Sequence, residues 1–371
     1  MAERKEKADG LRTGYSTGAC AAAASRAAME GLVTGKVPEQ IQSLLPNGQR
    51  VVFQVARSSL NTDFAQAVVI KDAGDDPDVT DKAQLTASLT PLRSQPGVIL
   101  IEGGPGVGRV TLPGLGLLVG GPAINPKPRQ NILDNISEVG ADWLKTSGVL
   151  VTISVPDGEK MAKRTLNARL GIVDGISILG TSGIVRAFST AAYRACVVQG
   201  VEVAASQGLS RVVLSTGGRT EKFIIKQFPD LPEACFVQMG DFLGAALDRA
   251  AELKIKKISI GAMVGKLTKI AQGERVTHAR KNQVDTGLLA RLAAQVGAGN
   301  AVCKEIELAQ TARFASERLA ELGLDLPFYQ ALIAHTLNTL HQNYSGAFSL
   351  DIWVCDFEGN YITSQSDQGA K

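Results

Sequence analysis

The chain is poor in aromatic residues and histidine, and it has no long hydrophobic run. Phe, Trp and Tyr make up 5% of its 371 residues, and three residues are His. No run of about 18 apolar residues is present, which excludes a transmembrane helix. The 39 Lys and Arg residues nearly balance the 36 Asp and Glu residues, for a formal net charge of +3. This balance excludes a general nucleic-acid or membrane-surface binder, because such proteins carry a larger and clustered basic excess.

Cysteine is scarce, and its spacing shows no pairing. Five cysteines are scattered without a Cys-x-x-Cys pair: Cys20, Cys196, Cys235, Cys303 and Cys355. An odd number without pairing spacing predicts free thiols in a reducing compartment, and hence a cytoplasmic protein. Residues 1–10 are charged and lack an apolar segment, so we expect a disordered tail and no secretory signal.

Glycine is the residue in excess, with 39 copies, where average usage is roughly 7%. Glycine permits tight turns and lets the backbone approach a ligand closely. Many of the glycines fall in clusters, over 14–18, 103–121, 171–183, 217–218 and 261–265. We interpret these clusters as ligand-facing turns.

The predicted elements divide the chain into two domains, as its length suggests. Over residues 1–187, short alternating runs and a few helices predict an α+β sandwich domain that carries the glycine-rich motifs. Over residues 188–371, strands alternate with helices, one of them predicted over 304–322, which is typical of a Rossmann-like domain. A β-hairpin around Gly359 is predicted near the end. The expected fold class is therefore α/β.

One glycine motif resembles a ligand loop. Ile101-Glu-Gly-Gly-Pro-Gly-Val-Gly108 follows an apolar run and has the E-x-G-x-G-x-G spacing of many methyltransferases that use S-adenosylmethionine. Such a loop needs a helix directly after it, whose N–H groups meet the ligand. Pro113 and Gly114 exclude a helix there. Two interpretations therefore stay open, a ligand loop and a glycine-rich turn between strands.

The densest charge cluster is Lys71-Asp-Ala-Gly-Asp-Asp-Pro-Asp-Val-Thr80. Its carboxylates predict a cation site, or acceptors for a ribose or an ammonium group. The spacing of a calcium-binding loop is absent. The alternative is a solvated acidic turn.

Three segments combine turn residues with cations. Residues 120–129 hold three prolines, which predict a stiffened loop that aims Lys127 and Arg129 at an anion. Residues 163–171 gather three cations, and residues 178–186 form a Gly/Thr/Ser turn whose N–H and hydroxyl groups suit carboxylates or phosphates. Rigid connectors and ordinary turns are the alternatives.

In the second half, short apolar runs predict strands at Val212–Leu214, Ala234–Met239 and Ile258–Ile260. Glycine turns end or follow these strands, in the segments 212–218, 239–244 and 261–267. Ligands bind at the carboxyl ends of strands in such sheets. His278 is a candidate catalytic residue, with a structural histidine as the alternative. His335 and His341 have the wrong spacing for a metal pair on one helical face.

Taken together, seven segments in order resemble the cobalt-precorrin-5B C1-methyltransferase family (CbiD) of anaerobic cobalamin biosynthesis. They are Leu11-Arg-Thr-Gly-Tyr-Ser-Thr-Gly-Ala-Cys-Ala-Ala-Ala23, Lys71-Asp-Ala-Gly-Asp-Asp-Pro-Asp-Val-Thr80, Glu102-Gly-Gly-Pro-Gly-Val-Gly108, Pro122-Ala-Ile-Asn-Pro126, Leu170-Gly-Ile172, Gly175-Ile-Ser-Ile-Leu-Gly-Thr181 and Gly265-Lys-Leu267. The chain departs from the family at Gly261-Ala-Met-Val-Gly-Lys266, where a usual His is missing.

The resemblance implies methyl transfer from S-adenosyl-L-methionine to C1 of cobalt-precorrin-5B, an anionic tetrapyrrole, to give cobalt-precorrin-6A. It implies catalytic roles for Lys266 and His278. The expected cofactor-binding residues are Asp75, Asp76, Asp78, Thr80, Gly103, Gly104 and Gly106. The expected substrate-binding residues are Arg12, Thr13, Tyr15, Thr17, Asn125, Arg129, Arg164, Asn167, Arg169, Thr181, Ser182 and Arg186.

Cobalt arrives inside the substrate, so no protein metal site is expected, and neither is a nucleic-acid or membrane partner. A homo-oligomer is left open. Two other hypotheses are kept beside this one: a non-catalytic tetrapyrrole carrier on the same scaffold, motivated by the missing His, and a nucleotide-binding enzyme built on the glycine loops.

Overall fold

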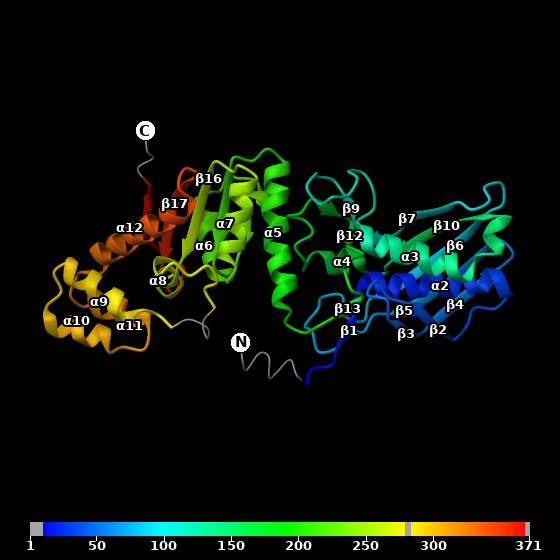
Figure 1. Cartoon of the computed structure of the whole chain (residues 1–371), viewed down its shortest axis with the longest axis horizontal. Coiled ribbons are helices and arrows are strands. Elements are labelled where there is room, and N and C mark those ends of the chain that lie inside the picture. The colour runs from blue at the N-terminus through cyan, green and yellow to red at the C-terminus, as the bar shows by residue number, and fades with distance from the viewer. Residues whose placement is uncertain (1–9, 279–282, 368–371) are drawn as a thin grey trace. The chain divides into compact units, whose positions relative to one another are not determined.

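The computed structural model describes residues 10–278 and 283–367, and Figure 1 shows the chain. It forms two compact units, one up to Ser189 and the other from Thr190 onward, called the N-terminal and the C-terminal unit. Apart from Gly10, the predicted tail lies outside the described residues. Within the described ranges, no helix is long and apolar enough to cross a membrane. The fold is mixed α/β, as predicted.

Helix α2 (Thr17–Thr34) is the centre of the N-terminal unit and is buried over most of its length. Ser16 caps its start by accepting the N–H of Ala19, and Gly35 ends it in the left-handed region at φ 80°. Alanine favours a helix and has a small side chain, so neighbouring elements approach α2 closely. Helix α3 (Pro126–Val139) and a β-sheet pack against it.

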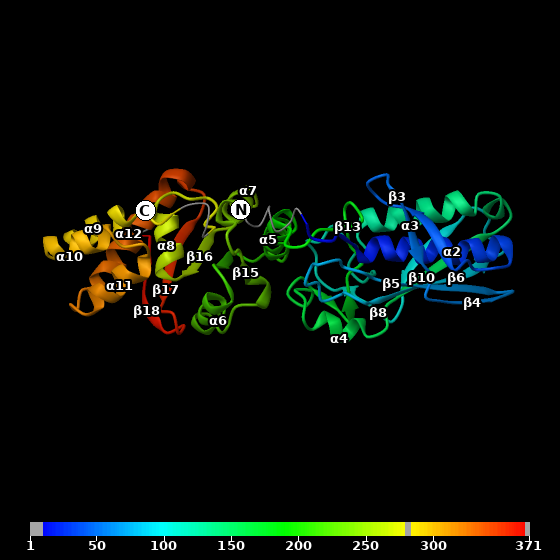
Figure 2. The same cartoon turned by 90° about the horizontal axis from the view of Figure 1, so that it is seen from below.

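The sheet of the N-terminal unit has the strand order β4-β5-β6-β10-β7. Strand β10 is parallel to β7, and the other neighbours are antiparallel. Figure 2 shows α2 and α3 on one face of this sheet, where they complete the hydrophobic core. The strands, with a separate hairpin β2–β3, are β2 Gln40–Leu44, β3 Arg50–Gln54, β4 Arg57–Asn61, β5 Phe64–Ile70, β6 Gln84–Leu92, β7 Ile99–Gly103 and β10 Gly148–Ser154.

Pairs of two-residue strands join distant segments of this unit. Strand β1 pairs with β13, β9 with β11, and β8 with β12. These strand pairs hold the glycine-rich motifs together through backbone hydrogen bonds. The elements are β1 Gly14–Tyr15, β8 Gly106–Val107, β9 Arg109–Val110, η1 Trp143–Lys145, α4 Gly158–Ala162, β11 Ile172–Val173, β12 Gly175–Ile176 and β13 Ile184–Val185.

The predicted stiff loop over residues 120–129 is wrong in its second half. Lys127 and Arg129 lie in the first turn of α3, where Pro126 and Pro128 also stand. Proline suits a first helical turn because its missing N–H would have no partner in the helix.

The C-terminal unit is built on a sheet in the order β15-β14-β16-β17-β18. The first four strands are parallel, and β18 is antiparallel to β17. The strand order reverses at β14, because β15 lies on one side of it and β16 on the other. The strands are β14 Arg211–Ser215, β15 Phe236–Gln238, β16 Lys257–Ala262, β17 Ser349–Cys355 and β18 Tyr361–Ser366.

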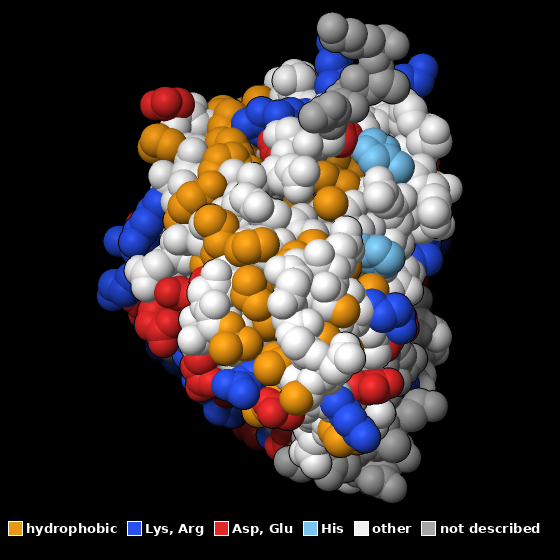
Figure 3. All heavy atoms as spheres, turned by 90° about the vertical axis from the view of Figure 1, so that its left-hand side faces the viewer, with side chains coloured by type: hydrophobic (Ala, Val, Ile, Leu, Met, Phe, Trp, Pro, Cys, Tyr) orange, Lys and Arg blue, Asp and Glu red, His pale blue; other side chains and the backbone are white. Residues whose placement is uncertain are grey.

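Helices cover both faces of this sheet. The larger core lies on one face with α5, α7, α8 and α12, and α6 covers the other with Phe223 and Ile224. On the described part of the face in Figure 3, hydrophobic side chains are mixed with charged ones of both signs. The helices are α5 Thr190–Ser206, α6 Gly218–Gln227, η2 Glu233–Cys235, α7 Leu243–Glu252, α8 Val264–Ala271, α9 Thr286–Gln295, α10 Asn300–Glu307, α11 Ala312–Ala320 and α12 Asp325–Tyr344.

Candidate functional site

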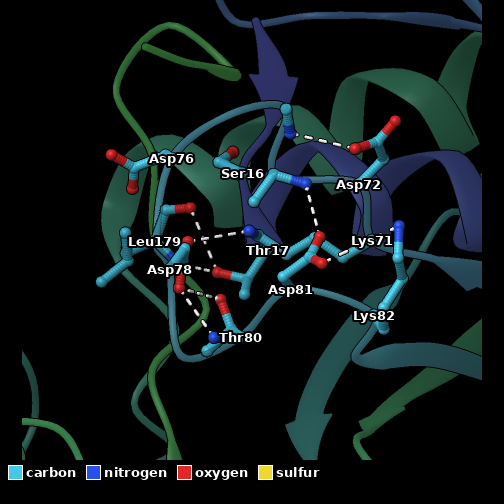
Figure 4. Close-up of polar contacts among 12 residues, drawn as sticks. Ser16, Thr17, Lys71, Asp72, Asp76, Asp78, Thr80, Asp81, Lys82 and Leu179 are labelled. Atoms are coloured by element: carbon cyan, nitrogen blue, oxygen red, sulfur yellow. Dashed lines mark hydrogen bonds and ion pairs between the residues drawn. The ribbon is translucent and has the colours of Figure 1, made fainter. Parts of the chain in front are cut away.

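Three motifs of the N-terminal unit meet at the start of α2 (Figure 4). The N–H of Tyr15 donates to the carbonyl of Asp72 at 2.7 Å, in the acidic loop. The N–H of Ser16 donates to the carbonyl of Gly183 at 2.9 Å. The hydroxyl of Thr17 accepts the N–H of Leu179 at 2.9 Å. The segment before α2 therefore lies between the acidic loop and the Gly/Thr/Ser turn.

The acidic loop, residues 71–83, is closed at its neck and braced by a buried ion pair. The N–H of Lys71 donates to the carbonyl of Ala83 at 2.8 Å. The side chain of Lys71 is 1% exposed, and its Nζ lies 2.8 Å from Oδ2 of Asp78. The other carboxylate oxygen of Asp78 accepts the N–H and the hydroxyl of Thr80, each at 2.7 Å. Burial raises the pKa of Asp78, but Lys71 and Thr80 outweigh it, so the net shift is downward.

The other carboxylates of this loop also hold the protein's own groups. Asp72 pairs with the guanidinium of Arg12, which with the N–H of Gly74 lowers the pKa of Asp72 to about 2. Asp75 accepts the N–H of Arg12 at 2.6 Å, and Asp76 accepts the N–H of Phe188 at 2.9 Å. Among the described residues, no set of three or more His, Cys, Asp or Glu side chains is arranged to hold a metal ion. Donor binding by Asp75, Asp76, Asp78 and Thr80 stays a prediction.

The structure gives a different reason for the glycines of the 101–108 motif. A Cβ on Gly103 would lie 2.7 Å from Pro122 Cβ. A Cβ on Gly104 would collide with the hydroxyl of Ser154. Gly106 has φ +77°, and a Cβ there would collide with the carbonyl of Val155. These glycines allow the protein to pack against itself. Their contact with a ligand stays a prediction.

The predicted substrate-binding residues fall into an exposed and an internal group. Exposed residues are Arg12, Thr13, Arg129, Arg164, Thr181 and Arg186. Thr17 and Asn167 are buried, and Nδ2 of Asn167 donates to the carbonyl of Gly175 at 3.0 Å. Partly buried residues are Tyr15, Asn125, Arg169 and Ser182. Among them, Tyr15 packs against the ring of Phe53, and the hydroxyl of Ser182 hydrogen-bonds to the backbone of Ile184 in its own turn.

In the C-terminal unit, the predicted catalytic residue Lys266 contacts the segment that carries the other one, His278. Nζ of Lys266 pairs with the carboxylate of Asp241 and lies 3.3 Å from the hydroxyl of Thr277. The Lys266 and Asp241 side chains are 28% and 26% exposed. Nζ of Lys269 donates to the carbonyl of His278 at 3.0 Å. These contacts place a positive charge at the carboxyl ends of β15 and β16, close to the backbone of His278.

Burial lowers the pKa of Lys269, and the neighbouring charge of Lys266 adds to that effect. Reasoning from sequence missed Asp241, Lys269 and Thr277. A signal existed for Asp241 alone, because it follows a strand in a glycine turn.

Comparison with known proteins agrees with these motifs. Residues 4–187 match the CbiD family, and residues 276–366 match the family described as CbiD, C-terminal domain. A protein of Polaromonas naphthalenivorans named cobalt-precorrin-5B C(1)-methyltransferase is 58% identical over 95% of this chain and 97% of its own. A protein of the same name from Methylococcus capsulatus is 57% identical, over 98% and 96%.

A crystal structure of a cobalamin biosynthesis protein from Archaeoglobus fulgidus is 28% identical to this chain. It covers 71% of this chain and 81% of its own, with a TM-score of 0.39. The near full-length identity to the two curated relatives and the two family matches lead to one conclusion. The chain belongs to the CbiD family.

Proposed function

We propose that this chain is a C-methyltransferase that methylates C1 of cobalt-precorrin-5B to give cobalt-precorrin-6A, with S-adenosylmethionine as methyl donor. The observation that carries the proposal is the 58% identity, over nearly the whole of both chains, to a relative named for that reaction. The donor supplies an activated methyl group on a sulfonium. A bond forms between this methyl carbon and C1 while the methyl–sulfur bond breaks, leaving S-adenosylhomocysteine.

The chemistry asks the protein for position more than for a nucleophile. The attacking atom is an electron-rich ring carbon of the substrate, and alignment alone can lower such a barrier by several kcal/mol, roughly 7 or more. The substrate carries many carboxylates. Arginine binds carboxylates through two parallel N–H donors. Arg129, Arg164 and Arg186 are exposed on the N-terminal unit and are assigned to those carboxylates.

Lys266 is assigned the role of a fixed positive charge, and His278 the role of proton carrier. Lys266 is held at one position by Asp241 and Thr277, so its charge is fixed at the sheet edge. The imidazole of His278 is the assigned proton carrier, since histidine titrates near neutral pH. Of the donor-binding residues predicted in the N-terminal unit, Gly104 and Gly106 are covered by neighbouring protein atoms, which favours a donor site elsewhere.

Two finer statements on the fold belong to this proposal. The C-terminal unit is assigned as a Rossmann-like domain, supported by four parallel strands with helices on both faces. The N-terminal unit is assigned as an α+β sandwich, supported by its sheet with α2 and α3 on one face.

The test is methyl transfer itself. Purified chain is incubated with cobalt-precorrin-5B and methyl-labelled donor, and the product is examined by mass spectrometry and NMR. Labelled methyl at C1 supports the proposal. Tetrapyrrole binding without methyl transfer would instead support the carrier hypothesis.

A further inference from the structure

The carboxyl edge of the C-terminal sheet holds Ser215, Gly217 and Gly218, which the proposed function does not use. Strand β14 ends there at Ser215, and α6 begins at Gly218. The order of strands reverses at β14, with β15 on one side and β16 on the other. In parallel α/β sheets, ligands bind outside the carboxyl ends of the strands at such a reversal.

The glycines at this edge have no structural need to be glycine. Gly217 has extended backbone, with φ 167°, and a Cβ there would meet no atom of the described residues within 4 Å. A Cβ on Gly218 would meet only Nε2 of Gln238, at 3.7 Å. Gly265, in the first turn of α8, also faces open space. Since neither backbone conformation nor packing explains them, these glycines leave room for a group from outside.

Ser215 adds an unpartnered polar atom at the same place. The residue is 1% exposed, and its Oγ has no hydrogen-bond partner among the residues that the structure describes. Because side chains alternate along a strand, Ser215 points to the face that α6 covers, as Val213 does. A buried hydroxyl without a partner destabilises the fold. A ligand atom at the start of α6 would supply that partner.

The start of α6 is suited to a carboxylate. Its N-cap residue is Gly217, which has no side chain to cap the first-turn N–H groups. The hydroxyls of Thr216 and Thr220 lie 3.2 Å apart beside this turn. N–H groups at a helix start, with the positive end of the helix dipole, bind anions. Asp241 follows the neighbouring strand β15, the position from which an acidic residue binds ribose hydroxyls in dinucleotide-binding sheets.

We propose that this edge of the C-terminal unit is the binding site of the methyl donor. The donor's carboxylate accepts hydrogen bonds from the first-turn N–H groups of α6 and from the hydroxyl of Ser215. Oδ1 of Asp241 pairs with Lys266, so the donor's ribose hydroxyls donate to the other carboxylate oxygen, Oδ2. The inference rests on the proposed methyl transfer and deepens it by naming the donor's contacts. It differs from the prediction that places the donor on the acidic loop.

The experiment measures S-adenosylhomocysteine binding to the intact chain by isothermal titration calorimetry. Gly217→Val fills the open space, and Ser215→Ala removes the unpartnered hydroxyl. Gly299→Val is the matched control, because Gly299 is also an N-cap glycine, at α10, with no atom within 4 Å of its Cβ position. Asp76→Asn tests the acidic loop as the alternative donor site.

Gly217→Val is expected to weaken binding at least about tenfold and Ser215→Ala about threefold, with unchanged thermal melting. Gly299→Val and Asp76→Asn should bind like wild type. Wild-type affinity in Gly217→Val, or a loss confined to Asp76→Asn, overturns the inference. If Gly217→Val unfolds at a lower temperature than wild type, the affinity of Ser215→Ala is compared with that of wild type instead. Wild-type affinity in Ser215→Ala then overturns the inference.

Wild-type methylation measured in parallel keeps the two claims apart. Where wild type methylates but the affinities do not follow the expected order, the proposed function stands and the donor site is wrong. A wild type that neither methylates nor binds overturns both. Should turnover occur without measurable S-adenosylhomocysteine affinity, the KM for the donor is compared across the same variants.

Discussion

The two regions that carry the sequence motifs are built in opposite ways. In the N-terminal unit, the carboxylates of the acidic loop hold the protein's own N–H groups and cations, and the glycines of the 101–108 motif are covered by neighbouring atoms. At the carboxyl edge of the C-terminal sheet, Gly217 and Gly218 face open space and Ser215 lacks a partner among described residues. A glycine-rich or charged motif is therefore weaker evidence for ligand contact where the protein's own atoms already cover or pair those groups.

The strongest test of this comparison is to add a side chain at a glycine that neighbouring atoms cover. Gly106→Ala is expected to destabilise the N-terminal unit by roughly 4 kcal/mol or more, because a Cβ collides with backbone and φ is +77°. Gly97→Ala is the matched control, since Gly97 has the same φ and open space around it. It should cost only about 1–2 kcal/mol. Calorimetric unfolding of both variants measures the difference, and equal losses would refute the packing argument.

The two Lys–Asp pairs test the same contrast with charge. Lys71→Met leaves Asp78 without its buried partner, so we expect a loss of about 3 kcal/mol in the free energy of unfolding. Lys266 is 28% exposed where Lys71 is 1% exposed, so Lys266→Met should lower the free energy of unfolding by less, about 1 kcal/mol. Methyl transfer should instead fall about 100-fold in Lys266→Met.

Urea unfolding and the methyl-transfer assay separate these outcomes. A Lys266→Met chain that unfolds as easily as Lys71→Met would show that both pairs are structural. Full activity in Lys266→Met would remove Lys266 from the reaction.

Acid should weaken the N-terminal unit. The pKa of Asp72 is about 2 and that of Asp78 is also lowered in the folded chain, whereas an unfolded Asp titrates near about 3.9. Their stabilising effect is therefore complete above the unfolded pKa and is lost as pH falls through the folded values. Hydrogen exchange of peptides from α2 should be faster at about pH 3 than expected from its protection at about pH 6, which would reveal this loss of stability.

Asp72→Asn should reduce that acid sensitivity. Asp142→Asn, which removes one partner of an ion pair at 73% and 94% exposure, is the control and should leave it unchanged. Equal acid sensitivity in wild type and Asp72→Asn would show that other groups control the loss.

The smallest effect on stability is expected for an exposed cation of the N-terminal unit. Arg164→Gln should change unfolding by no more than about 0.5 kcal/mol and raise the KM for the tetrapyrrole about three- to tenfold. Lys145→Gln, at an exposed cation outside the predicted set, is the comparison. Unchanged KM in Arg164→Gln would withdraw this residue from the substrate site.

Local pattern was enough for the buried strands of the C-terminal unit. Short apolar runs predicted strands at Val212–Leu214 and Ile258–Ile260, and β14 and β16 lie there, because strands buried on both faces are continuously apolar. Strand β6 was missed, since Thr, Ser and Pro interrupt its pattern. The single helix predicted over 304–322 is wrong, because Thr311 caps a new helix.

The candidate site was less accessible to sequence reasoning. Lys266 was predicted from the family resemblance, and His278 was a candidate before it. The groups that contact them, Asp241, Lys269 and Thr277, come from the turn after β15, from α8 and from the segment after α8, which only the folded chain brings together. Whether a glycine is covered depends on neighbours distant in sequence, such as Ser154 beside Gly104. Spacing along the chain carries no such information.

The alanine-rich helix α2 has a consequence for synthesis on the ribosome. It is made before its partners, because α3 begins at Pro126 and strand β10 ends at Ser154. Domains generally close as units while the chain emerges from its N-terminal end. Strands β5 and β6 follow sooner, but the packing around α2 is complete only after more than a hundred later residues. Until then, its small side chains expose little apolar surface to which chaperones or other nascent chains could bind.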